Sequence, residues 1–115
     1  MGVGQVTDLK KYSEGVVNLA LDTEETILEM VGLGEISGWV SLKNMEDGDK
    51  VTIESHVKLG SGSAFELHES DSYSDVQTKS SLRFLNFVGC YGIKITLTQT
   101  AGTPRTYPYL FFRKG

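Results

Sequence analysis

Histidine and glutamate residues at alternating positions are the side chains of this sequence that could bind a metal ion. Glu54 and His56 are two residues apart in one predicted strand, and Glu66 and His68 are two apart in the next. If these strands pair around the turn at 60–63, all four side chains lie on one outward face, because alternate residues of a strand share a face. Two histidines and two carboxylates could bind zinc. Polar side chains on the wet face of any sheet give the same pattern, so we predict no metal site.

The acidic segment Glu46-Asp47-Gly48-Asp49 is a second group of oxygen ligands. A calcium loop supplies about six to eight oxygens from regularly spaced residues and a more distant glutamate. The spacing here does not match that arrangement. The segment is typical of a turn in which Gly48 adopts a positive φ and the aspartates bond to nearby backbone.

No motif in the sequence supports catalysis. Cys90 is the only cysteine, and we expect it to be a small buried residue at the start of a strand. The glycine pairs Gly32/Gly34 and Gly60/Gly62 lack the strand-to-helix context of a phosphate-binding loop. A Ser–His–Asp triad has no nucleophile elbow to support it. We therefore predict no catalytic residue, no cofactor-binding residue and no enzymatic activity.

Charge and composition narrow the range of partners. The 115 residues carry a formal net charge of −4, and the 11 basic residues are scattered along the chain. Nucleic acids and anionic membranes attract concentrated lysine and arginine, so we expect neither as a partner. No apolar run approaches the roughly 18 residues of a membrane span, and the N-terminus lacks the apolar stretch of a signal peptide. With one cysteine and no disulfide, the chain suits a reducing cytoplasm.

Alternating apolar residues predict about eight short strands, separated by turns rich in glycine and polar residues. The expected strands lie at 15–21, 26–31, 36–42, 51–59, 65–67, 80–87 and in the two halves of 91–112, with a polar connection at 70–78. No alternating helices occur, so a parallel sheet is excluded. We predict an all-β fold, an antiparallel β-sandwich that is jelly-roll-like or immunoglobulin-like, with Trp39 between the sheets.

The chain divides into an N-terminal arm at 1–14 and a single β-sandwich domain at 15–115. Apolar residues are sparse in the first segment, and Gly2 and Gly4 loosen its backbone. Val3, Val6 and Leu9 are its apolar positions, and we expect them to act as an assembly arm.

The C-terminal strand carries an unusual share of large apolar side chains. Successive Phe111 and Phe112 must point to opposite faces, so both faces of the strand are apolar. Pro108 lacks a backbone donor, which predicts an edge strand or a bulge. An apolar edge strand can be covered by a neighbouring subunit. The predicted subunit interface comprises Tyr107, Tyr109, Phe111 and Phe112.

The segments GWVSLKNMEDGDKVTIESHVKL and YGIKITLTQTAGTPRTYPYLFFRKG resemble small uncharacterised β-sandwich proteins associated with viruses of bacteria or archaea. The resemblance implies a virion component, such as a capsid subunit, a decoration protein or a tail accessory, that is assembled in the cytoplasm. We therefore expect a non-enzymatic structural protein that forms a homo-oligomer or docks on other structural subunits.

The alternative is a small ligand-binding module for a carbohydrate or peptide, in which Trp39 and the tyrosines stack on the ligand. An alternating strand favours burial of Trp39, which weighs against this alternative. The sequence identifies no small-molecule ligand.

Overall fold

The computed structural model describes the backbone of residues 9–114 and the side chains of 10–84 and 87–114. Within this range the chain forms eight strands and no helix, which confirms the predicted all-β fold. The strands are β1 (Leu9–Asn18), β2 (Glu25–Val31), β3 (Gly34–Ser41), β4 (Lys50–Lys58), β5 (Glu66–Ser74), β6 (Ser81–Gly89), β7 (Gly92–Ala101) and β8 (Thr106–Lys114). Residues 9–114 contain no helix of the length and apolar character needed to cross a membrane.

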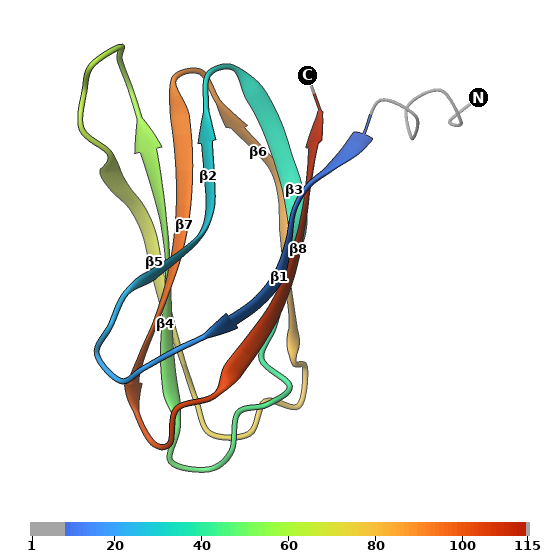
Figure 1. Cartoon of the computed structure of the whole chain (residues 1–115), viewed down its shortest axis with the longest axis vertical. Helices are drawn as coiled ribbons and strands as arrows, with labels where there is room; N and C mark the ends of the chain where they lie inside the picture. The colour runs from blue at the N-terminus through green and yellow to red at the C-terminus, as the bar shows by residue number, and fades with distance from the viewer. Residues whose placement is uncertain (1–8, 115) are drawn as a thin grey trace.

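Two four-stranded antiparallel sheets pack face to face (Figure 1). Sheet A has the order β1-β8-β3-β6, and sheet B has the order β2-β7-β4-β5. The first strand pairs with the last, the second with the seventh, the third with the sixth and the fourth with the fifth. The chain is therefore one long nested hairpin rolled into a sandwich. This strand order is that of a jelly roll, which decides between the two predicted sandwich types.

The core lies between the sheets and is built by the predicted alternation of apolar residues. Ile93, Ile95 and Leu97 of β7 have no exposed surface, and Ile36 and Val40 of β3 face them from the other sheet. Full burial of each such side chain stabilises the fold by about 1.5 to 3 kcal/mol.

Two predicted boundaries are wrong. β1 begins at Leu9 and pairs with β8 from there onward, so residues 9–14 belong to sheet A and not to an arm. Val3 and Val6 lie outside the described residues. β5 continues to Ser74 through a run of polar residues that we assigned to a connection. β5 is the edge strand of sheet B and is exposed almost throughout, so it does not need the apolar alternation that identifies a half-buried strand.

The predicted edge position of the C-terminal strand is also wrong, because β8 lies between β1 and β3. Pro108 is tolerated since the pairing with β3 covers only Tyr109 to Lys114. Beside Pro108, β8 has a neighbour only on the β1 side, where Pro108 stands opposite Val16. The strand is therefore central for most of its length and has one free side at the proline.

The β3–β4 and β7–β8 connections lie at the same end of the sandwich (Figure 1). A buried carboxylate, Asp49, connects them. Asp49 is 1% exposed and accepts hydrogen bonds from the backbone N–H groups of Glu46 and Thr103 and from Arg105 Nε at 2.8 Å. Gly48 has a φ of 96°, which confirms the predicted turn. The acidic segment is thus a structural turn whose last carboxylate ties two loops together.

Candidate functional site

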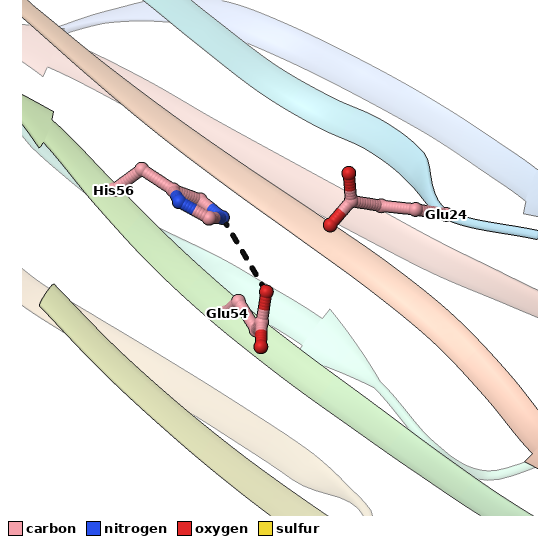
Figure 2. Close-up of side chains that lie close together, drawn as sticks. All are labelled: Glu24, Glu54 and His56. Carbon is pink, nitrogen blue, oxygen red and sulfur yellow. Dashed lines mark ion pairs between the residues drawn. The ribbon is translucent and has the colours of Figure 1, made fainter. Parts of the chain in front are cut away.

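Glu24, Glu54 and His56 converge on the outer face of sheet B (Figure 2). Glu54 and His56 are two residues apart on β4, so strand alternation places both on this face. Glu24 immediately precedes β2, on the other side of β7. It follows a turn in which Asp22 has a positive φ of 59° and donates its N–H to the Gln99 carbonyl of β7. The turn brings Glu24 to the two β4 side chains although it is distant from them in sequence.

The ligand atoms of these three residues lie within 4.8 Å of one another. The Nε2 atom of His56 is 3.6 Å from Glu54 Oε1, which is an ion-pair distance and not a hydrogen bond. The two side chains are 14% and 29% exposed. The Nε2 atom itself is buried and has no hydrogen-bond partner among the residues that the structure describes.

Neighbouring hydroxyl groups hold both carboxylates in place. Thr96 of β7 lies between the two glutamates and donates its hydroxyl to Glu24 Oε2 at 3.2 Å. Ser70 of β5 donates its hydroxyl to Glu54 Oε2 at 3.2 Å. Each glutamate therefore has one oxygen oriented by the protein and a second oxygen that is available to a ligand.

The predicted four-residue face is only partly correct. Ser55 pairs with Glu69 and His56 with Leu67, so His68 is an extra residue in a β-bulge. The His68 ring lies 5.6 Å from the Phe87 ring of sheet A, away from His56. Glu66 pairs with Val57 and thereby falls on the face opposite His56. Only Glu54 and His56 remain together, and Glu24, which was not among the predicted ligands, completes the group.

The outer face of sheet A carries an apolar strip across β1, β8 and β3. Its members are Val16 of β1, Trp39 of β3, and Pro108, Leu110 and Phe112 of β8. Trp39 is 42% exposed and Val16 is 59% exposed, while the three β8 residues are partly exposed. The prediction that Trp39 lies in the core is wrong, because its neighbours Gly38 and Val40 face inward and alternation turns Trp39 outward.

One row of residues crosses the whole of sheet A at this strip. Glu14 pairs with Leu110, Leu110 with Trp39, and Trp39 with Arg83, on β1, β8, β3 and β6. The row therefore reads acidic, apolar, aromatic, basic from one edge of the sheet to the other. The Arg83 guanidinium lies 5.7 Å from the Trp39 ring centroid, a cation–π distance. Glu14 also forms an exposed ion pair with Lys11, in which Lys11 Nζ lies 3.0 Å from Glu14 Oε1.

The four aromatic residues predicted to form an interface separate into two groups. Tyr107 and Phe111 have no exposed surface and pack in the core, so their side chains are not accessible to a neighbouring subunit. The Tyr107 hydroxyl donates to Gln99 at 2.9 Å, and burial raises the pKa of Tyr107 to about 12. Tyr109 is half-buried against the core, and Phe112 is half-buried on the outer face. Of the four, Phe112 alone belongs to the apolar strip.

The structure also differs from the predictions for Cys90 and for the strip residues. Cys90, expected to be buried, is exposed in the turn between β6 and β7. Val16, Trp39 and Leu110 were missed as outer-face residues because they look like core positions in an alternating sequence. Only their pairing partners reveal which face they occupy.

Comparison with known proteins adds no functional assignment. No family model matches the sequence, and neither a curated protein nor a solved structure matches the chain.

Proposed function

We propose that the protein is a non-enzymatic structural subunit that self-associates through the outer face of sheet A. The observation that carries this proposal is the row Glu14–Leu110–Trp39–Arg83, in which an apolar centre is flanked by opposite charges. Exposed aromatic and apolar groups of this kind are the residues that contribute most binding energy at subunit interfaces.

The charge order of the row selects a second copy of the chain as the partner. A half-turn about an axis parallel to the strands lays one sheet A on another and reverses the order of the row. Glu14 then faces the partner subunit's Arg83, and Leu110 faces the partner subunit's Trp39. A half-turn about an axis across the strands would instead place like charges together. The face is therefore self-complementary in the way that a two-fold interface requires.

The remaining strip residues extend the same contact. Phe112 lies two residues after Leu110 on β8. Pro108 lies two residues before Leu110 and pairs with Val16 of β1. The centre of such an interface excludes water and supplies most of the affinity, while the flanking charges mainly select the orientation.

A virion component, assembled in the cytoplasm, is the biological setting that we propose. Two considerations support it: the resemblance of the two segments 38–59 and 91–115 to β-sandwich proteins of viruses of bacteria or archaea, and the jelly-roll strand order, which is common among capsid domains.

Light scattering after size exclusion, over a series of protein concentrations, tests the self-association. We expect a dimer or larger species that Trp39→Ser dissociates. Leu33→Ser is the matched control, since Leu33 is even more exposed (69%) but lies in the β2–β3 turn and is not a member of the strip. A chain that stays monomeric at high concentration, or that associates equally well with Trp39→Ser, contradicts the proposal.

A charge exchange tests the orientation. Glu14→Arg alone and Arg83→Glu alone should each weaken association, because like charges then meet across the two-fold axis. The double variant should restore it. Loss of the Lys11–Glu14 ion pair has little effect by itself, since exposed pairs contribute about 0 to 1 kcal/mol. If the double variant is as weak as the two single variants, the proposed axis is wrong.

The second candidate function is a carbohydrate-binding module, which the exposure of Trp39 favours. Trp39 lies beside the serine pair Ser41 and Ser81 on an open sheet face, an arrangement that could stack on a sugar ring and bond its hydroxyls. A monomeric chain whose Trp39 fluorescence changes on addition of glycans would favour this function over self-association.

A further inference from the structure

We propose that Glu24, Glu54 and His56 bind a divalent transition-metal ion, with zinc as the best-fitting ion, on the outer face of sheet B. This site is independent of the proposed self-association, because it lies on the opposite outer face of the sandwich (Figures 1 and 2).

The unpartnered imidazole nitrogen is the first reason. His56 Nε2 is shielded from solvent and forms no hydrogen bond with any side chain or backbone group that the structure describes. A buried polar atom without a partner is costly, and native proteins leave few of them. Figure 2 shows Nε2 directed toward the two carboxylates, where a metal ion would give it a ligand bond.

The two carboxylates are the second reason. Glu24, just before β2, and Glu54, on β4, hold their oxygens within 4.8 Å of each other and of the imidazole. Two negative charges at this separation repel unless a cation lies between them. The nearest cross-strand lysine, Lys94, pairs with His56 in the sheet, but its Nζ lies 5.0 Å from the Phe65 ring centroid in a cation–π contact.

The hydroxyl groups of Thr96 and Ser70 are the third reason. Each bonds one oxygen of a glutamate and leaves the other free. Metal-binding carboxylates are generally oriented by such outer hydrogen bonds, which fix the ligands before the metal arrives.

The ligand types select the metal. Imidazole together with carboxylates suits zinc and related transition-metal ions, whereas calcium and magnesium prefer oxygen ligands alone. The three side chains would occupy three positions of a tetrahedral zinc ion, and water would take the fourth. The bound ion would connect the start of β2 with β4 across β7.

Zinc titration by calorimetry, combined with thermal unfolding, tests the site. The full chain carries Cys90→Ser, because an exposed thiol binds zinc by itself. We expect one zinc ion per chain and a rise in Tm of about 10 °C when free zinc exceeds its Kd about 100-fold. His56→Asn and Glu24→Gln should each abolish both effects. Thr96→Val should weaken binding about tenfold, as expected for a residue that orients a ligand.

His68→Asn is the matched control, since it removes the other histidine and leaves the three ligands in place. Circular dichroism establishes that each variant is folded. The proposal is overturned if zinc neither binds nor raises Tm, if binding survives His56→Asn, or if His68→Asn abolishes it. A lower Tm of the His56→Asn variant without zinc, together with no zinc effect in the parent chain, would identify the group as a plain Glu54–His56 ion pair.

Discussion

Asp49 has surroundings that its position in an acidic turn does not indicate. It lies in an acidic turn, yet it is buried and bonds to Arg105 and to two backbone amides from separate loops. Burial raises the pKa of Asp49, but the hydrogen bonds from Glu46, Arg105 and Thr103 outweigh it and lower the pKa below the ordinary 3.8. The folded state therefore favours the ionised carboxylate.

Asp49→Asn should lower the free energy of unfolding at pH 7 by about 1 to 3 kcal/mol, because it removes the charge of a buried carboxylate that is paired with the partly exposed Arg105. A lowered pKa means that the stabilisation is fully present above the unfolded pKa and is lost as pH falls through the folded pKa. The difference between the two proteins should therefore be constant near neutral pH and shrink on acidification below about pH 4.

Urea unfolding at several pH values measures this difference. Asp47→Asn is the control, since it makes the same change two residues away at an exposed position. A difference between the wild-type chain and Asp49→Asn that does not vary with pH would show that the carboxylate acts through packing and not through its charge.

Phe111 and Phe112 are neighbours with opposite roles. Phe111 stands opposite Gly38 of β3, where a Cβ would meet the Phe111 ring and the Leu110 carbonyl, so the glycine makes room for the ring in the core. We expect Phe111→Ala to lower the free energy of unfolding by about 3 to 5 kcal/mol. Phe112→Ala should cost about 1 kcal/mol or less and should instead weaken self-association. Denaturant unfolding and light scattering of both variants separate the two effects, and equal destabilisation would contradict the assignment of faces.

At the scale of elements, β1 is a full member of sheet A. Its pairing with β8 begins at Leu9, and the Ser13 hydroxyl donates to the Ile27 carbonyl of β2 in the other sheet. Deleting residues 1–14 should therefore lower the free energy of unfolding by roughly 3 kcal/mol through lost hydrogen bonds to β8. Deletion of residues 1–8 removes none of the pairing that the structure describes and serves as the control. Equal thermal melts of the two truncated chains would show that residues 9–14 add nothing to the sheet.

At the scale of the whole molecule, the nested pairing makes nearly all strand contacts long-range. β1 and β8 pair although they are the first and last strands. The sequence separation of the paired strands decreases inward from β2–β7 to β3–β6, and only β4 and β5 are consecutive strands. Closing such long loops must precede the contacts that stabilise them, so we expect refolding in about milliseconds to seconds. Stopped-flow refolding followed by Trp39 fluorescence, at a concentration where the chain is monomeric, measures the rate. Refolding in microseconds would contradict this expectation.

The sandwich also separates the two proposed sites. The self-association strip lies on sheet A and the metal ligands lie on sheet B, with the core between them. Variants of one site should therefore leave the other intact, which allows the two proposals to fail separately.

Local alternation of apolar residues is enough to predict most of the strands and most of the core. Period-two alternation identified six of the eight strands in large part, because each has one face that is buried against the other sheet. It missed the extent of β5 and the start of β1, where an edge position removes that requirement. It also placed Glu54 and His56 on one outward face, since that depends only on local alternation.

Which strands pair, and therefore which side chains meet, became known from the three-dimensional structure. Glu24 reaches His56 because β2 and β4 both flank β7, and a single bulge at His68 removes the second histidine. Trp39 faces outward and Phe111 inward for the same reason: a shift of one residue in register exchanges the two faces of a strand. Register is set by long-range pairing and by bulges, which local sequence patterns do not encode.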